Sequence, residues 1–226
     1  MAGPFNSLYP VGMTIAPAPA KADLSVAISA SIDPGAAERM MLVNKELMDH
    51  YGTRYVVNPD FPPHVSLLLS GAAATALPDL ERLVKEQAKK QKVIRTNATR
   101  IDLDATGFLR TECAVNEDLK SLHRDLVEAF KVIHEKDPRV RASDFSRWTE
   151  LKFDDGKIIS DSFKPHLSIG WVDSDNASPA RTLAESILKV PFEVELRTLD
   201  LVEVDQRNQL WRVITSVPLG ETCSGM

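Results

Sequence analysis

The chain has 226 residues, 43% of them hydrophobic, and its 27 Lys and Arg against 32 Asp and Glu give a formal net charge of −5. This length and apolar content are enough for one large domain with a buried core, which excludes a largely disordered chain. Two cysteines exclude a disulfide scaffold, no apolar run approaches the roughly 20 residues of a membrane span, and the acidic balance argues against a protein that coats long duplex nucleic acid. Residues 1–22 contain four prolines and no continuous apolar stretch, which predicts an irregular arm rather than a signal peptide, and a cytoplasmic location.

The next part of the chain predicts alternating strands and helices. Apolar residues alternate from Leu24 to Ile32, which is typical of a half-buried strand. Asp33-Pro34-Gly35 favours the start of a helix, which we expect to end at Gly52. Strands are predicted next at residues 54–57, 64–70, 93–103 and 108–115, and helices at residues 75–91 and 116–135. Asn116 is expected to cap the last of these helices.

The second half ends in the same mixture of elements. Strands are predicted at residues 166–172, 192–204 and 210–219, and a helix at residues 178–188. Strands outnumber helices and hairpins are frequent, which indicates an α+β fold with antiparallel or mixed sheets rather than an alternating parallel fold. We expect one bilobal domain over residues 23–220, and a short tail at residues 221–226.

One short motif occurs twice in the sequence, as PHVSL at residues 63–67 and as PHLSI at residues 165–169. Each copy begins a predicted strand, and residues i and i+2 of a strand point to the same face. Each motif therefore places an imidazole and a hydroxyl side by side, His64 with Ser66 and His166 with Ser168. A single His-x-Ser arises by chance in many chains, but two copies in the same setting indicate a function.

Simple alternation also predicts the faces of the neighbouring residues. Leu68 is expected on the face of His64 and Ser66, and Gly170 on the face of His166 and Ser168. The opposite, helix-covered face is expected to bury the residues in between: Val65, Leu67, Leu69, Leu167, Ile169 and Trp171.

Two imidazoles facing each other suit the cleavage of a phosphodiester or a cyclic phosphate. One group must take a proton from the attacking water, and another must protonate the departing oxygen. Histidine does either near neutral pH, and such catalysis contributes about 10²–10⁴-fold to the rate. The two hydroxyls are suited to donate hydrogen bonds to the phosphate oxygens. This scheme requires no metal and no cofactor.

These motifs resemble those of the 2H phosphoesterases, a family named for two His-x-Ser/Thr motifs in a duplicated fold. The likeness covers residues 24–219 and includes the Gly107-Phe108 strand and the helix around Leu119–His123. It implies a bilobal α+β fold in which two sheets face a central cleft and helices lie on the outside. It also implies His64 and His166 as general base and acid, in an order that the sequence does not fix, with Ser66 and Ser168 as phosphate ligands.

Other candidate site residues lie near the second motif. The long connection 137–160, a possible lid, holds three residues suited to stack on a base or pair with phosphate: Phe145, Arg147 and Trp148. An equally weighted alternative is a surface loop whose aromatic residues pin it to the body. Lys164 is expected either to raise the local positive potential or to face solvent. No set of ligands with metal-site spacing occurs, and His123 is predicted to be a packed residue.

The resulting hypothesis is a metal-independent, monomeric phosphodiesterase. It would hydrolyse 2′,3′-cyclic phosphates or 2′-5′ phosphodiester bonds of nucleotides or short RNA ends, and bind neither membranes nor long duplexes. Three alternatives remain open. They are an RNA 2′-5′ ligase that uses the same site, a non-catalytic nucleotide-binding module, and a phosphoesterase for a non-nucleotide cyclic phosphate.

Overall fold

A computed structural model describes residues 23–136, 141–142, 153–154, 157–158, 163–205 and 209–220. The predicted arm at residues 1–22, the tail at residues 221–226 and most of the connection 137–160 lie outside this part. No helix in the described ranges is long and apolar enough to cross a membrane.

The helices and strands follow the predicted order closely. The four α-helices of the described ranges are α1 (Pro34–Tyr51), α2 (Leu77–Lys90), α3 (Glu117–Lys136) and α4 (Ala177–Leu188), with short 3₁₀ helices at Ala74–Ala76 and Ser174–Asn176. The long strands are β1 (Asp23–Ile32), β2 (His64–Ala73), β3 (Ile94–Leu103), β4 (Phe108–Cys113), β8 (His166–Trp171), β9 (Phe192–Val204) and β10 (Leu210–Pro218). The two-residue strands are β5 (Arg141–Ala142), β6 (Phe153–Asp154) and β7 (Lys157–Ile158).

Helix starts agree with the sequence signals. The Asp33 carboxylate accepts a hydrogen bond from the Ala36 backbone N–H at 2.9 Å, and Pro34 occupies the first helical position of α1. The amide oxygen of Asn116 accepts from the Leu119 N–H at 2.9 Å at the start of α3, which confirms the predicted cap.

The strand predicted at residues 54–57 is wrong. This segment has no regular structure: only the Arg54 N–H bonds to a strand, at the Trp171 carbonyl of β8, and the other bonded backbone groups pair with side chains. Asn44 on α1 donates to the Tyr55 carbonyl at 2.8 Å and accepts from the Val57 N–H at 2.9 Å. The Thr53 hydroxyl also donates to the Tyr55 carbonyl. Sequence propensity alone gives no sign of these partners.

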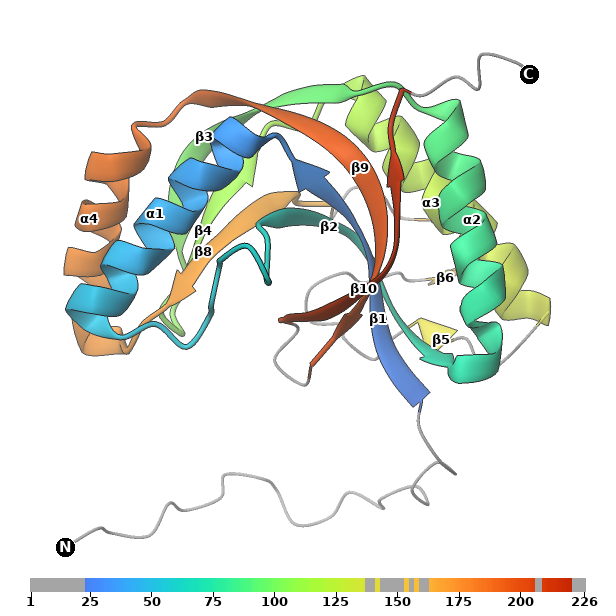
Figure 1. Cartoon of the computed structure of the whole chain (residues 1–226), viewed down its shortest axis with the longest axis horizontal. Helices are drawn as coiled ribbons and strands as arrows, with labels where there is room; N and C mark the ends of the chain where they lie inside the picture. Colours follow the sequence, from blue (N-terminus) through green and yellow to red (C-terminus); the bar gives the residue numbers. More distant parts are fainter. Residues whose placement is uncertain are drawn as a thin grey trace, which may run out of the picture.

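The long strands form one antiparallel sheet in the order β1-β2-β8-β4-β3-β9-β10. Because β9 also pairs with β1, six of these strands close into a ring. The sheet arches across the molecule, and the helices lie in two pairs at its ends (Figure 1). The predicted α+β fold with helices outside is therefore confirmed, and the two expected sheets are joined into one, by β9 and by the pairing of β2 with β8.

Each helix pair covers a different part of the ring. Helices α1 and α4 pack together over β8 and β3, whereas α2 and α3 pack together over β2, β9 and β10 (Figure 1). We call each helix pair with the strands that it covers a lobe. Helix α1 lies between β1 and β2 in sequence but covers β8 in the other lobe, so each lobe contains segments from both halves of the chain. The core between sheet and helices is apolar, and its largest buried side chains include Phe130, Met40 and Leu122.

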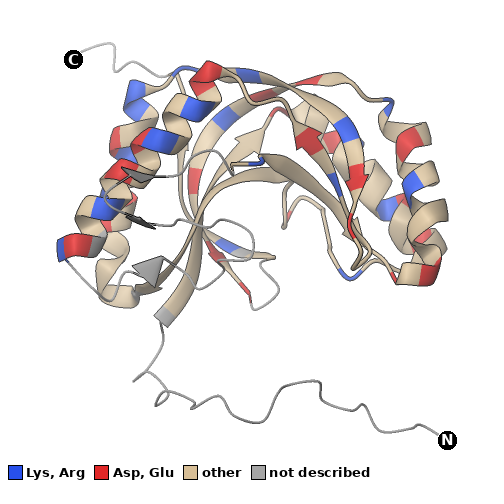
Figure 2. Ribbon diagram, turned by 180° about the vertical axis from the view of Figure 1, so that it is seen from behind, with Lys and Arg blue, Asp and Glu red and all other residues tan. Residues whose placement is uncertain are grey.

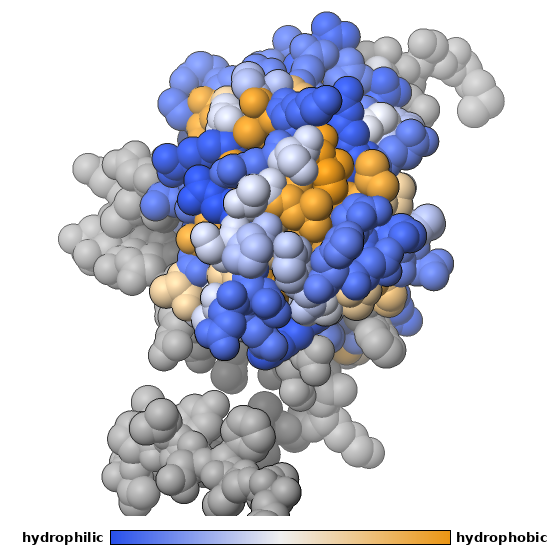
Figure 3. Space-filling model, turned by 90° about the vertical axis from the view of Figure 1, so that its left-hand side faces the viewer, coloured by the Kyte–Doolittle hydropathy of each residue, from blue (hydrophilic) through white to orange (hydrophobic). Residues whose placement is uncertain are grey.

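The outer surfaces of the helices carry many of the charged side chains, with both signs mixed (Figure 2). The side covered by α1 and α4 is mostly hydrophilic and has one apolar patch near its centre (Figure 3). The face of the sheet that the helices leave open carries the two repeated motifs.

Candidate active site

The two His-x-Ser motifs lie side by side on adjacent strands. Strands β2 and β8 pair antiparallel, with Val65 opposite Leu167. In this register His64 lies opposite Ser168, and Ser66 lies opposite His166. All four side chains therefore share the face away from the helices, since both intervening residues are buried in the helix-covered core. The motifs, distant in sequence, form a compact square of two imidazoles and two hydroxyls.

A β-bulge follows each motif. Ser66 is opposite Ser29 but Leu68 is opposite Ile28, so Leu67 is an extra residue in β2. In the same way Ser168 is opposite Arg110 but Gly170 is opposite Leu109, so Ile169 is an extra residue in β8. A bulge reverses the faces of all residues beyond it.

The bulges correct four of the predicted positions. Leu68 packs in the main core with Leu67, not beside His64, and Leu69 leaves that core for a separate small cluster with Ala27 and Val202. Gly170 faces α1, where a Cβ on this residue would lie 3.1 Å from Leu47 Cδ1. Trp171, which alternation placed in the core, stands instead beside Phe108 on the open face. The rule that side chains alternate between the two faces of a strand fails here, because it assumes that strand pairing continues without a bulge.

Each bulge carbonyl is held by one buried polar side chain from a covering helix. The Asn44 amide on α1 donates to the Ile169 carbonyl at 2.8 Å. The His123 imidazole on α3 bonds through Nδ1 to the Leu67 carbonyl at 2.9 Å and stacks on Phe163 with ring centroids 4.0 Å apart. Because a carbonyl only accepts, Nδ1 of His123 carries the proton. His123 is thus a packed residue, as predicted, and the two lobes hold their bulges in equivalent ways.

The two motif histidines also have equivalent hydrogen bonds. Nδ1 of His64 lies 3.0 Å from the Pro62 carbonyl, and Nδ1 of His166 lies 3.0 Å from the Lys164 carbonyl. Each Nδ1 must donate, since its partner is an acceptor, so Nε2 is the nitrogen that gains or loses a proton. Both rings thus have the same tautomer, with Nε2 as the basic nitrogen.

The electrostatic surroundings of the two histidines differ. Burial lowers the pKa of His64, while the Pro62 carbonyl and the negative charge of Asp200 raise it. Burial also lowers the pKa of His166, and the Lys164 carbonyl raises it. The positive charges of Arg110 and His64 lower the pKa of His166 further, and Glu112 raises it. Both imidazoles thus have a pKa below the ordinary 6.5.

A row of polar side chains extends from the motifs across the open face. Cross-strand partners on the His64 side are Ser29, Ser31, Thr198, Asp200 and Ser216, and on the His166 side they are Arg110, Glu112, Arg100 and Asp102. Sequence reasoning missed these residues because each belongs to another strand, and only the pairing register brings them next to the motifs.

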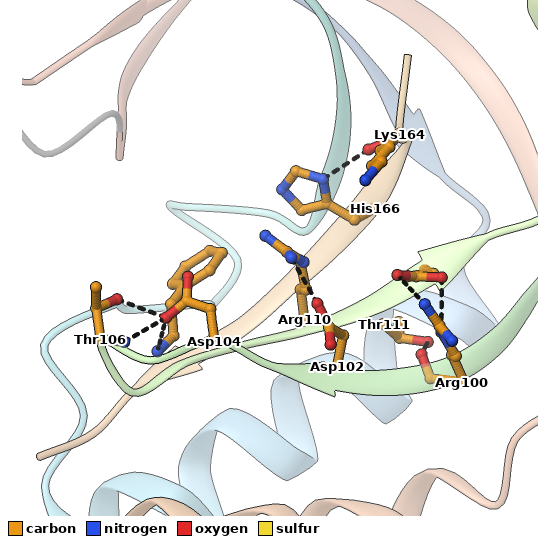
Figure 4. A network of polar contacts seen from close by, with 10 residues as sticks. Arg100, Asp102, Asp104, Thr106, Arg110, Thr111, Lys164 and His166 are labelled. Atoms are coloured by element: carbon orange, nitrogen blue, oxygen red, sulfur yellow. Dashed lines mark hydrogen bonds and ion pairs between the residues drawn. The ribbon is translucent and has the colours of Figure 1, made fainter. Parts of the chain in front are cut away.

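Arginine side chains lie on the His166 side of the site. Figure 4 shows the guanidinium of Arg110 pointing toward the imidazole of His166. Arg110 also donates to the Asp102 carboxylate, and Arg100 forms two hydrogen bonds of 2.8 Å with Glu112. Lys164 has an exposed side chain, and its carbonyl, not its ammonium, contacts His166.

Three aromatic residues form a cluster next to His166. The ring of Phe108 makes edge contacts with Tyr55, Trp171 and His166, at centroid distances of 6.0, 6.4 and 6.3 Å. The Tyr55 hydroxyl hydrogen-bonds the Ser168 side chain, and burial raises the pKa of Tyr55. The aromatic residues predicted for this role, Phe145 and Trp148, lie outside the described residues together with Arg147.

Among the described residues, no three His, Cys, Asp or Glu side chains gather as metal ligands would. The polar groups beside the motifs are imidazoles, hydroxyls, guanidinium groups and carboxylates, and the first three of these suit an anionic ligand.

The sequence matches the family model of the 2′-5′ RNA ligase superfamily over residues 49–208. This match spans more than half of the chain, so the protein belongs to the 2′-5′ RNA ligase superfamily. It has the 2H phosphoesterase fold that its repeated motifs indicated.

Several solved structures share this fold, among them one from Thermus thermophilus and one from E. coli. The Thermus thermophilus protein TT0787 is similar at 16% identity with a TM-score of 0.59, covering 88% of this chain and 100% of that one. Apo LigT of E. coli is similar at 11% identity with a TM-score of 0.52, covering 88% of this chain and 99% of that one. Comparison with curated proteins finds no significant match.

Proposed function

We propose that the protein is a phosphodiesterase that hydrolyses 2′,3′-cyclic phosphates or 2′-5′ phosphodiester bonds of nucleotides or short RNA ends. The observation that carries this proposal is the register of β2 and β8, which sets His64 and His166 beside Ser168 and Ser66. Both imidazoles present Nε2 for proton transfer, because their Nδ1 atoms are engaged by carbonyls. The superfamily supports an enzyme that acts on phosphoesters.

The reaction needs two proton transfers around one phosphorus atom. One neutral imidazole takes a proton from water through Nε2 while the water oxygen forms a bond to phosphorus. The bond from phosphorus to the ribose oxygen breaks, and the other imidazole, protonated on Nε2, gives its proton to that oxygen. The products are a phosphate monoester and a free hydroxyl. Ser66 and Ser168 hydrogen-bond the non-bridging oxygens, and Tyr55 orients the Ser168 hydroxyl.

The substrate class is tested by an activity screen after EDTA treatment. Its panel contains the four 2′,3′-cyclic mononucleotides, 3′,5′-cyclic nucleotides and 2′-5′-linked diadenylate, with the double variant His64→Ala/His166→Ala as control. Turnover that survives chelation and is absent from the variant is the expected result. Joining of paired RNA halves without turnover of the panel would favour the ligase instead. Turnover that the double variant retains would contradict the two-histidine mechanism.

The aromatic cluster supplies a surface on which the nucleobase stacks. Trp171→Ala is expected to raise KM for a nucleotide substrate about 5- to 150-fold, since stacking contributes about 1–3 kcal/mol per base, and to change kcat less. Trp171→Phe is the matched control and should retain most of the affinity. Equal KM values for wild type and Trp171→Ala would place the base elsewhere.

The pH dependence follows from the partial or full removal of both imidazoles from water, which lowers the pKa of each. The active form carries one proton on the pair, and burial lowers the pKa of each ring below 6.5. This singly protonated form is therefore most abundant on the acid side of 6.5, and both rings become neutral as the pH rises further. We expect a bell-shaped profile of kcat/KM with its maximum below pH 6.5, measured in buffers of constant ionic strength. A maximum above pH 8 would contradict this.

A further inference from the structure

One carboxylate beside the motifs is buried in an unusual environment. Asp200 on β9 is only 2% exposed and accepts hydrogen bonds from three hydroxyls. The Ser31 hydroxyl lies 2.6 Å and the Thr198 hydroxyl 2.9 Å from Oδ2, while the Ser216 hydroxyl bonds to Oδ1. The donors come from three strands, β1, β9 and β10, so this position of the carboxylate is well defined.

Asp200 differs from the acids on the other side of the site by having no cationic partner. Within the described ranges, no Lys or Arg lies within ion-pair distance of Asp200, whereas Glu112 pairs with Arg100 and Asp102 with Arg110. Burying a carboxylate without a counter-charge is costly even when hydroxyls satisfy its oxygens. A neighbour that becomes positive during the reaction would offset this cost.

The neighbour that can become positive is His64. Ser31 is the cross-strand partner of His64 and also bonds to Asp200, so the imidazole and the carboxylate lie on either side of one serine. The ionisable groups described around His64 are Asp200 on β9, His166 on β8 and Tyr55, whose raised pKa keeps it neutral. Strand β1 contributes only hydroxyls, those of Ser29 and Ser31.

The charges around His166 disfavour its protonation, in contrast to those around His64. The guanidinium of Arg110 points toward this ring (Figure 4), and its positive charge opposes protonation. Glu112 favours protonation of His166, but its charge is largely offset by the two hydrogen bonds with Arg100. The two motifs are equivalent in backbone and hydrogen bonding, yet their charges differ.

We propose that Asp200 stabilises the imidazolium of His64, so that His64 is the general acid and His166 is the general base. This inference rests on the proposed phosphodiesterase function. At the start of a cycle His64 holds the proton on Nε2 and His166 is neutral. His166 takes the proton of the attacking water, and His64 gives its own to the departing ribose oxygen. Exchange with solvent then returns the pair to its starting state. Asp200 acts through His64 and is a positioning residue.

The direct test is an NMR titration of the histidine rings in wild type and in Asp200→Asn. Removal of the negative charge should lower the pKa of His64 by about one unit and leave that of His166 nearly unchanged. Glu112→Gln is the control on the His166 side, where Glu112 is the direct cross-strand partner of this histidine. It should shift the pKa of His166 instead, by a smaller amount because Arg100 offsets the charge of Glu112. If Asp200→Asn does not fold by circular dichroism, Asp200→Ser removes the same charge and keeps a hydrogen-bonding group.

The pH profile of kcat/KM then tests whether His64 is the general acid and His166 the general base. The alkaline limb reports loss of the proton from the acid, so Asp200→Asn should move this limb to lower pH while the acid limb stays in place. A shift of the acid limb instead, or an unchanged His64 titration, would overturn the proposal. A wild type without activity would refute the proposed function, whereas the NMR titration would still decide whether Asp200 acts on His64.

Discussion

Replacing His64 or His166 by alanine is expected to lower turnover by about 10²–10⁴-fold, because each variant loses one of the two proton transfers. Each serine variant, Ser66→Ala or Ser168→Ala, should lose less, since the remaining hydroxyl still contacts the phosphate. The double histidine variant should be little worse than either single variant, because the two rings act as a unit. The measurement is kcat on the best substrate of the screen.

Folding of these variants must be shown separately. Both rings contact backbone carbonyls through Nδ1, and asparagine keeps a donor in a similar place. His64→Asn and His166→Asn are therefore the matched variants, expected to be folded by circular dichroism and as inactive as the alanine forms. Full activity in any folded variant at either position would contradict the mechanism.

The largest effect on stability is expected from Asn44→Ala. The buried amide donates to the carbonyls of Tyr55 and Ile169 and accepts from the Val57 N–H. Alanine leaves three buried backbone groups without this partner, at a cost of about 1–3 kcal/mol each before relaxation, so we expect a loss of roughly 3–5 kcal/mol. Urea denaturation measures the difference in the free energy of unfolding.

The control for Asn44→Ala is Lys45→Ala, one residue further on the same helix. Lys45 is exposed, and its ion pair with Asp49 one turn away is screened by solvent, so its loss should leave the free energy of unfolding nearly unchanged. A loss below 1 kcal/mol for Asn44→Ala would show that water replaces the amide, and would contradict a role in fixing the bulge.

Local sequence signals predicted most of the fold. Asp33-Pro34 and Asn116 mark helix starts through their own side chains, and the alternation from Leu24 to Ile32 describes the strand that forms. The repetition of the motif also suggested that its two copies lie together, because segments in equivalent structural environments tend to have similar sequences. Such features are set by residues close together in the sequence, so a single sequence is enough to predict them.

Features that depend on distant partners could not be predicted. Nothing around the two motifs signals a bulge, because the carbonyl of each bulge residue bonds to a side chain of a distant helix. The Leu67 carbonyl bonds to His123, and the Ile169 carbonyl bonds to Asn44. Trp171 consequently changes face. Asp200 is hidden in an apolar strand pattern, and only pairing with β1 brings it near His64. The candidate residues proposed from the connection 137–160 lie outside the described part, so their role stays a prediction.

The shared strand β9 has a consequence for the synthesis of the protein. The ring closes through contacts such as Ser31 with Asp200, which are 169 residues apart in sequence. Strands β1 and β3 therefore keep an unpaired edge until β9 has left the ribosome. Pairings of such long range are slow to form, and unpaired edges promote aggregation. The nascent chain is thus most vulnerable just before its last strands emerge, and a transcript truncated within β9 would yield a product with both edges open.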